Sequence, residues 1–244
     1  MLIKKHLLKL IVLCCFLSIT GAQAELVTGV LAGEDESLIK SKSQGEIVKL
    51  LVIEGEQVKA GDVLAVIDDE QEVLEHRLAG VEYKTAEKDY LKTKQLKKFV
   101  SSEEILQKKN IYLKKKTIFE LKSYNLRSTK VVSPISGVVT KQFIKRGEMV
   151  GSGEKIFEVI NLGKLIIELD IAAKAASKLK QGQRLLFTTE LDAKDSFNGM
   201  ISYIAPVVDK TSGTVRVRLN LPNPRSKQGA YRLKPGTMVN VKLN

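Results

Sequence analysis

The pattern of hydrophobic and polar positions changes twice along the chain. From about Leu26 to Asp68, and again from Val131 to the end, short runs rich in Val, Ile and Leu alternate with glycine-containing turns, which is typical of β-strands. Between these regions, residues 70–130 contain no proline and only one glycine, with many Lys, Glu, Leu and Gln residues. That composition favours helix. The sequence therefore predicts a mainly β fold interrupted by a helical segment.

The helical segment breaks once, at the stretch S-S-E-E that begins with Ser101. Ser101 and Glu104 fit a capping box, while Val100 and Ile105 occupy the positions of a hydrophobic staple. A new helix is therefore expected to start here, so that the segment forms a hairpin with arms over about 70–98 and 102–127. Apolar 3,4 spacing predicts an antiparallel coiled coil. The expected seam residues are Tyr83, Ala86 and Tyr90 on the first arm and Leu106, Leu113, Thr117 and Tyr124 on the second.

The two β regions contain the same pattern at an offset of 92 residues, in GEIVKLLVIEGEQVKAGDVLAVID (45–68) and GVVTKQFIKRGEMVGSGEKIFEVI (137–160). Three glycine pairs keep register, namely Gly45 with Gly137, Gly55 with Gly147, and Gly61 with Gly153. Glycine at such positions predicts positive φ or close backbone approach. Apolar residues on both faces of the flanking strands indicate that both faces are covered. We therefore expect the two halves to pack on each other as one closed β-sandwich.

The first 24 residues are typical of a secretory signal peptide, with a basic start, an apolar stretch and Ala22-Gln23-Ala24 as the cleavage site. The apolar run, LIVLCCFLSIT, is shorter than the roughly 20 residues needed to span a bilayer. Cleavage would remove both cysteines and His6, leaving His76 as the only histidine. The sequence thus predicts an exported protein with no disulfide, no metal site, no cofactor and no catalytic residue, and it is not expected to be an enzyme.

The chain is basic, and its formal charge of +12 falls by three when the leader's lysines leave. Export, and the lack of aromatic residues between the basic ones, exclude nucleic acid as the expected partner. Residues 92–116 hold nine lysines against Glu103 and Glu104. A solvated flank of the coiled coil is one interpretation of this cluster. Electrostatic steering toward an acidic channel mouth is the other.

The repeated β-unit resembles the lipoyl/biotinyl-carrier fold, whose two halves meet at a turn that holds a modified lysine. In this chain the corresponding position is interrupted by DDEQEVLEH and the whole helical hairpin. No lysine lies there between acidic or methionine neighbours. The interpretation as a carrier subunit of an acyl- or carboxyl-transfer enzyme therefore lacks its chemical residue.

A lipoyl-like domain split by a helical hairpin is similar to the periplasmic adaptor, or membrane fusion protein, family of bacterial efflux and secretion systems. LIIELDIAAKAASKLKQGQRLLFTTE (165–190) resembles the first strand, short helix and second strand of the adaptor β-barrel. FNGMISYIAPVVDKTSGTVRVRLNLPNP and LKPGTMVNVKL resemble its later strands. The implied domains are a signal peptide (1–24), an N-terminal strand joining the barrel (25–36), lipoyl-like halves (37–68 and 131–162), the hairpin (69–130) and the barrel (163–244).

The turn residues that recur in this family are expected to determine the fold and to carry no chemistry. In the barrel they are Gly199, Pro206, Gly213 and Gly236. The six glycines of the internal repeat are expected to determine the fold as well. Adaptors of resistance-nodulation-division pumps usually continue into a membrane-proximal domain. The given sequence ends at Asn244, after the barrel's last strand. The resemblance therefore implies that the contact with the transporter is reduced, is made by the barrel itself, or is supplied by a partner chain.

The resemblance implies a periplasmic adaptor that forms a ring of identical subunits and links an inner-membrane transporter to an outer-membrane channel of the TolC type. A resistance-nodulation-division transporter is favoured, and an ABC transporter stays open. A carrier-type enzyme subunit, or an envelope scaffold without an export conduit, are the alternatives from other classes.

In this family the hairpin tip docks against the channel, often with an Arg, a Leu four residues on and a Ser seven further. Here Lys92 replaces the Arg, Leu96 fits, and Ser102 follows after six residues. The candidate docking tip comprises Lys92, Leu96, Phe99, Val100, Ser101 and Ser102. Each of these residues also has a structural interpretation. The serines would cap the helix, Phe99 and Val100 would pack at the tip, and Leu96 would belong to the seam of the coiled coil.

Overall fold

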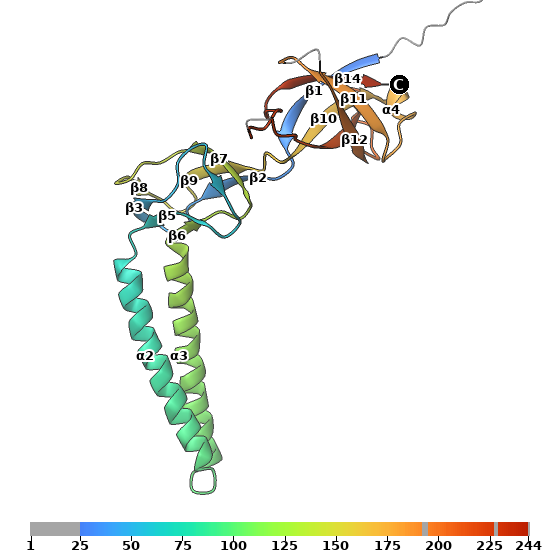
Figure 1. The fold of residues 1–244 in the computed structure, drawn as a ribbon. Helices are drawn as coiled ribbons and strands as arrows, with labels where there is room; N and C mark the ends of the chain where they lie inside the picture. The colour runs from blue at the N-terminus through green and yellow to red at the C-terminus, as the bar shows by residue number, and fades with distance from the viewer. Residues whose placement is uncertain (1–24, 192–194, 227–228, 244) are drawn as a thin grey trace, which may run out of the picture. The chain divides into compact units, whose positions relative to one another are not determined.

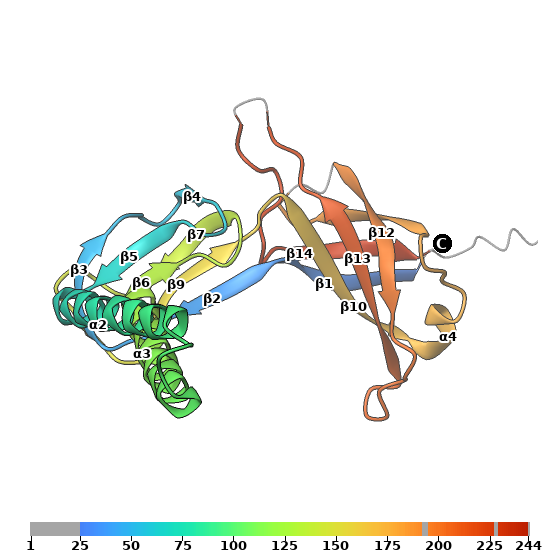
Figure 2. The same cartoon turned by 90° about the horizontal axis from the view of Figure 1, so that it is seen from below.

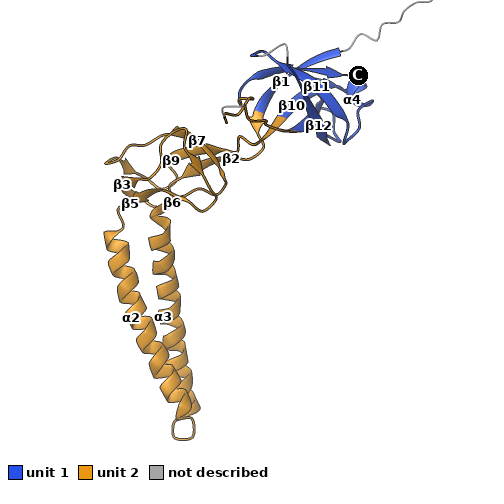
Figure 3. Cartoon of the chain, viewed as in Figure 1, with its two compact units in different colours: residues 1–31, 167–220, 236–244 blue, residues 32–166, 221–235 orange. Residues whose placement is uncertain are grey.

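The computed structural model describes residues 25–191, 195–226 and 229–243, so the expected signal peptide lies outside the described residues. The chain divides into two compact units (Figure 3). One joins residues 1–31, 167–220 and 236–244, and the other joins residues 32–166 and 221–235. Residues 221–235 therefore group with the second unit, although the sequence places them within the 163–244 barrel.

The second unit contains a β-sandwich of two four-stranded sheets, with strand orders β2-β9-β7-β4 and β6-β5-β3-β8. The strands are β2 (Glu36–Lys40), β3 (Gly45–Leu50), β4 (Gln57–Val58), β5 (Val63–Ile67), β6 (Lys130–Val132), β7 (Gly137–Gln142), β8 (Met149–Val150) and β9 (Lys155–Ile160). Each sheet combines strands that precede the helical hairpin with strands that follow it. The sandwich is therefore assembled from both repeats.

The two repeats exchange strands and hydrogen bonds across a local two-fold relation. Strand β3 pairs with β8 and, in the equivalent place, β4 pairs with β7. The Gly55 N–H donates to the Val139 carbonyl at 2.8 Å, and the Gly147 N–H donates to the Ile47 carbonyl at 2.9 Å. Because an unpaired buried backbone group is costly, neither half can satisfy its turns alone. The predicted split sandwich is confirmed.

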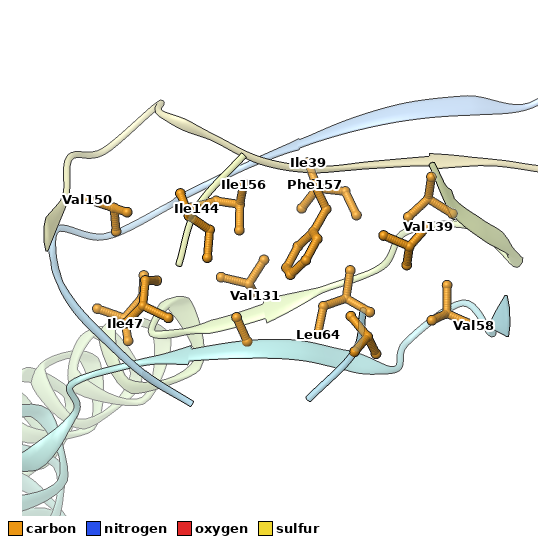
Figure 4. Packing of buried hydrophobic residues seen from close by; sticks show 14 residues of the cluster. Ile39, Ile47, Val58, Leu64, Val131, Val139, Ile144, Val150, Ile156 and Phe157 are labelled. Carbon is orange, nitrogen blue, oxygen red and sulfur yellow. The ribbon is translucent and has the colours of Figure 1, made fainter. Parts of the chain in front are cut away.

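The sandwich core lies between its two sheets, and Figure 4 shows side chains from both sheets pointing toward one another. Phe157 projects its ring from β9 into this space, with Ile47 and Leu64 on the opposite sheet, and all three side chains are fully buried. Burying one such side chain contributes about 1.5–3 kcal/mol. The apolar faces that the sequence predicts for the two repeats thus pack against each other.

Two kinds of constraint explain the repeated glycines. Gly55 and Gly147 have φ of +89° and +86°, which costs an L-residue about 1–2 kcal/mol. Gly137 is needed for space, because a Cβ there would lie 2.5 Å from the Ile160 carbonyl oxygen. The other fold-determining residues expected from the sequence include five more glycines with positive φ, namely Gly45 (+148°), Gly61 (+92°), Gly153 (+86°), Gly213 (+69°) and Gly236 (+86°). Pro206 follows strand β12 (Ser196–Ile204). The expectation of a turn is wrong for Gly199, which is buried within β12, where a Cβ would lie 3.2 Å from Leu219 Cβ.

Two long helices, α2 (Glu70–Gln95) and α3 (Ser102–Ser128), leave and re-enter the sandwich at adjacent strands (Figure 1). Strand β5 leads into α2 and β6 follows α3, and the two strands pair with Ala65 opposite Val131. The Ile67 N–H also donates to the Thr129 carbonyl at 2.9 Å. The base of the hairpin is therefore held by a β-ladder.

Aromatic rings line the seam between α2 and α3, alternating between the helices. The ring centroids of His76 and Phe119 are 4.9 Å apart, and those of Phe119 and Tyr83 are 5.5 Å apart. Tyr112 continues the stack between Tyr83 and Tyr90, at 5.8 and 5.6 Å. Ring pairs in this range are worth about 0.5–1.5 kcal/mol each beyond the area that they bury. The seam is thus a ladder of five rings.

The prediction of the seam residues on the second arm is wrong. Leu106, Leu113 and Tyr124 are 55%, 44% and 55% exposed, and Thr117 is exposed too. The side chains that face α2 are Tyr112, Lys115, Phe119 and Lys122. Lys115 Nζ lies 2.8 Å from Glu82 Oε2, and Lys122 Nζ lies 2.6 Å from Glu75 Oε2. Lysine stems pack along apolar surface while their ammonium groups reach a carboxylate, so lysines fill places where the periodicity required leucine.

The first unit is a closed barrel with strand order β1-β10-β13-β12-β11-β14 (Figure 2). Its elements are β1 (Glu25–Gly33), β10 (Lys164–Ala172), α4 (Ala173–Ala176), β11 (Arg184–Thr189), β12 (Ser196–Ile204), β13 (Thr214–Pro222) and β14 (Met238–Leu243). The barrel closes because β1 pairs with β14, with Val27 opposite Val241. Ile167, Leu185 and Leu219 are fully buried inside it. The predicted small β-barrel is confirmed.

Candidate functional site

The hairpin tip is a short turn between α2 and α3. Helix α2 ends at Gln95, and the N–H of Leu96, its C-cap, donates to the Thr93 carbonyl at 3.1 Å. The Phe99 N–H then donates to the Leu96 carbonyl at 2.8 Å. These bonds use the free carbonyl groups of the helix end and set the direction in which the following side chains project.

Ser101 begins the second helix as its N-cap. Its Oγ accepts the Glu104 N–H at 3.1 Å, and Glu103 and Glu104 lie in the first turn, where carboxylates interact favourably with the helix dipole. Ser102 is the first residue of α3 and is exposed. Ser101 therefore caps the helix, which is the structural role considered for the serines. Ser102 is exposed to solvent.

The apolar tip residues differ in how far they are exposed. Phe99 is 86% exposed and Leu96 is 44% exposed, whereas Val100 is half-buried. Phe99 is therefore not packed at the tip, and Leu96 lies beyond the end of α2 and not in the seam. An almost fully exposed phenylalanine ring costs hydration free energy unless a partner covers it. This ring is the most exposed large apolar side chain among the described residues.

Basic side chains surround the exposed ring. Lys92 and Lys94 lie in the last turn of α2, and Lys97 and Lys98 lie in the tip turn itself, all of them exposed. Lys94 Nζ lies 5.9 Å from the Tyr90 ring centroid, which extends the ring ladder toward the tip. An apolar side chain ringed by cations matches a partner surface that is apolar at its centre and acidic around it.

The described residues can be compared with what a metal site or a carrier site requires. They contain no group of three or more His, Cys, Asp or Glu side chains that could hold a metal ion. His76 stacks on Phe119 in the seam. Where a carrier domain would present its lysine turn, β5 runs through Asp68 into α2, and the Asp68 carboxylate accepts the Glu70 N–H at 3.3 Å. The hairpin therefore occupies the place of the carrier site.

The seam perturbs two ionisable groups of the hairpin. The pKa of Glu75 is lowered because Lys122 and Gln71 donate hydrogen bonds to its carboxylate. Burial, with hydrogen bonds to Tyr112 and Glu87, raises the pKa of Tyr83 to about 12. Both groups keep one protonation state near neutral pH, with Glu75 charged and Tyr83 neutral.

Sequence reasoning missed a further surface on the hairpin's outer faces. Leu74, Leu78 and Val81 on α2 are 57%, 64% and 61% exposed, and Leu121 on α3 is 56% exposed. The helical spacing of these apolar residues is visible in the sequence. Spacing alone does not distinguish the inner face of a hairpin from its outer face. For this reason the outer stripe of the second arm was predicted to be the seam, and the outer stripe of the first arm was not recognised.

Comparison with known families gives two matches that together span most of the chain. The model described as "RND MFP, barrel-sandwich hybrid domain", in which MFP stands for membrane fusion protein, matches residues 36–162. The model described as "CusB-like, beta-barrel domain" matches residues 165–244. None of the helices in the described ranges is both long enough and apolar enough to cross a membrane.

Individual relatives are similar over both matched domains. The chain is 26% identical over 222 residues to the multidrug resistance protein MexA of Pseudomonas aeruginosa, covering 84% of this chain and 57% of that protein. It is 28% identical over 210 residues to the cobalt-zinc-cadmium resistance protein CzcB of Cupriavidus metallidurans, covering 77% and 38%. The chain thus spans about half the length of the curated relatives that it matches.

A solved structure shares the fold. It is a chimeric MacA–MexA protein that contains the Pseudomonas aeruginosa MexA α-hairpin domain. The match has a TM-score of 0.78 and 26% sequence identity, and it covers 90% of this chain and 82% of the chimera.

Proposed function

This chain belongs to the membrane fusion protein family, and we propose that it is the periplasmic adaptor of an efflux system, linking an inner-membrane transporter to a TolC-like outer-membrane channel. Its contribution is mechanical and non-enzymatic. Export through a cleaved signal peptide would place it in the periplasm. The transporter supplies the energy and selects the substrate, while this chain provides the connection.

The exposed tip of the hairpin carries the proposal. A 26-residue helix and a 27-residue helix hold Phe99 roughly 40 Å from the sandwich, at 1.5 Å of rise per residue. The tip is apolar and basic, and no other described element of the sandwich unit reaches away from the core in this manner (Figure 1). Such an arm suits a contact with a distant partner protein.

The transporter is proposed to be of the resistance-nodulation-division class, because the matching family model is described by that class. An ABC transporter is the alternative. The similarities to a multidrug resistance protein and to a cobalt-zinc-cadmium resistance protein are nearly equal, so they favour neither drugs nor metal ions. We also propose that several copies form a ring around the export path.

The tip is tested by replacing Leu96 and Phe99 together with Asp. Because both side chains are exposed, the variant keeps its fold and its abundance in the envelope, and it loses export. The matched control is Leu51→Asp, which changes an apolar residue that is 52% exposed and lies outside the hairpin. Export at the normal level by the tip variant would contradict docking through the tip.

The partners are tested by crosslinking the protein in intact envelopes and identifying what it captures. An inner-membrane transporter together with an outer-membrane channel is the expected result, and the transporter's class distinguishes a resistance-nodulation-division from an ABC system. Capture of envelope proteins without either component, with unchanged export of drugs, metal ions and proteins after gene deletion, would instead indicate a scaffold.

A further inference from the structure

Two apolar patches lie on the outer faces of the hairpin. The α2 patch comprises Leu74, Leu78 and Val81, and the α3 patch comprises Thr117, Leu121 and Tyr124. The five large side chains are 55–64% exposed. Within each patch the residues follow 4,3 spacing, which places them on one stripe of a helix. Single exposed leucines are ordinary, but two such stripes on one hairpin indicate a surface that is covered in the assembled protein.

The two patches lie at the same height above the sandwich. The ion pairs across the seam set this register, because Glu75 is level with Lys122 and Glu82 is level with Lys115. Since the helices are antiparallel, two steps up α2 from Glu75 correspond to two steps down α3 from Lys122. Arg77 is therefore level with Glu120. Each patch spans this level to within about one helical turn.

A hairpin cannot cover its own patches, because its helices face each other through the ring ladder. His76 and Phe119 point into the seam, whereas Leu78 and Leu121 point away from it and stay exposed. An α2 patch can therefore meet an α3 patch only between two molecules. If identical hairpins stand side by side at one height, the α2 patch of one copy lies directly opposite the α3 patch of the next.

The charges beside the patches are complementary. Arg77 and Lys84 flank the α2 patch, and no ion pair is found for either within the described part of the chain. Glu120 flanks the α3 patch and is the only acidic residue from 105 to 128. Its single ionic contact is to Lys116, at 3.9 Å, and its side chain is 62% exposed. Arg77 and Glu120, which are level with each other, form the natural pair between copies.

A recess beside the α2 patch supplies shape as well as charge. Gly80 is the one glycine of the hairpin, and the Phe119 ring lies under it, because a Cβ on Gly80 would be 3.2 Å from Phe119 Cε2. The missing side chain leaves a recess of about 420 Å³, lined also by Val73, Arg77 and Val81. The recess lies about level with Thr117 in the register set by the ion pairs, so it faces the neighbour's α3 patch.

We propose that these patches form a heterologous contact between copies of this chain, in which the α2 patch of one hairpin packs on the α3 patch of the next. Arg77 pairs with Glu120 of the neighbouring copy, and the neighbour's Leu121 covers Leu74 and Leu78. A head-to-tail contact of this kind closes into a ring by rotation. The inference rests on the proposed ring and names the surface through which the hairpins join it.

Disulfide trapping tests the geometry. In a Cys14→Ser, Cys15→Ser background, the chain carries only introduced cysteines. The protein with both Leu78→Cys and Leu121→Cys is expected to give a ladder of multimers when oxidised in the envelope. A mixture of the two single variants should give only dimers that contain one of each. Leu91→Cys with Leu121→Cys is the matched control, because Leu91 is 49% exposed but lies about three and a half turns beyond Leu78 on α2, and it should give no ladder.

Charge exchange tests the ion pair. Arg77→Glu alone is expected to weaken self-association by about three- to tenfold, in the range of exposed ion pairs and like-charge repulsion. Adding Glu120→Arg should restore it. Failure of the second change to rescue the first, or oligomers that form without any disulfide between positions 78 and 121, would overturn this contact. Neither result bears on tip docking, which the Leu96 and Phe99 variant tests separately.

Discussion

Replacing Phe119 with Ala removes the ring that joins His76 to Tyr83 in the seam. The Phe119 ring contacts those of His76 and Tyr83, at centroid distances of 4.9 and 5.5 Å, and it fills the space beneath Gly80. No other residue of the hairpin can take its place, because the neighbouring seam positions on α3 are lysines paired with glutamates. The substitution therefore opens a cavity in the seam, nearer the base of the hairpin than its tip, and interrupts the ring ladder.

The expected cost follows from two contributions. A fully buried Phe→Ala change costs about 3–5 kcal/mol, and because Phe119 is half-buried, we expect about 2–3 kcal/mol. Phe119→Leu keeps most of the apolar volume and loses two ring pairs, which are worth about 0.5–1.5 kcal/mol each. That variant should therefore cost about 1–3 kcal/mol, and less than Phe119→Ala because it leaves a smaller cavity. Leu113→Ala, on the outer face and 44% exposed, should cost less than about 0.5 kcal/mol.

The assay is helical circular dichroism during urea unfolding, at a concentration low enough for the protein to be monomeric. The free energies of unfolding of the three variants should rank with Phe119→Ala lowest and Leu113→Ala close to the parent protein. Leu113 belongs to the seam that apolar periodicity alone predicts, whereas Phe119 belongs to the seam of the structure. If Leu113→Ala destabilised the hairpin as much as Phe119→Ala, the ring ladder would not be the seam.

Two further predictions concern the sandwich and the effect of pH. Gly137→Ala should lower the free energy of unfolding by about 3 kcal/mol, because its Cβ meets a backbone oxygen of the paired strand. Gly147→Ala should lower it by about 1–2 kcal/mol, because Gly147 has a positive φ. Equal losses of the two variants in urea unfolding would contradict this difference. Glu75 has a lowered pKa through Lys122, so its stabilisation is present above its unfolded pKa of about 4.3 and disappears as pH falls through the folded value. Glu75→Gln should therefore be less stable than the parent at pH 7 and equally stable near pH 3, and a gap that persists at pH 3 would refute the pairing.

The sandwich was predictable because its constraints are local and repeated. Gly55 and Gly147 occupy equivalent turns, and their positive φ leaves a recognisable residue type at a fixed spacing in both copies. The apolar runs around them indicated that each half needed the other. The exchange of strands, with β3 on β8 and β4 on β7, was not predictable. Pairing between distant segments depends on which edges remain free after each half folds, and local residue patterns carry no such information.

The seam of the second arm was mispredicted for a physical reason. Periodicity identifies apolar stripes, but α3 has two, and the one with more aliphatic residues is the outer one. On the inner stripe, Lys115 and Lys122 alternate with Tyr112 and Phe119. Lysine counts as polar in a pattern, although its stem packs like an apolar side chain once its charge is paired. The identity of the inner stripe is thus decided by glutamates on the other helix.

The departure of the tip from the Arg-Leu-Ser spacing of related pumps changes which groups remain available for docking. Ser101 uses its hydroxyl to cap α3, so a contact through that hydroxyl would require the helix start to give up a hydrogen bond worth about 1 kcal/mol. Phe99 makes no such demand, since its ring is 86% exposed and its backbone N–H is already bonded within the turn. Burying one exposed ring contributes about 1.5–3 kcal/mol. If the tip docks as proposed, we expect the contact to be made by Phe99 and the lysines around it more than by the serines of the motif.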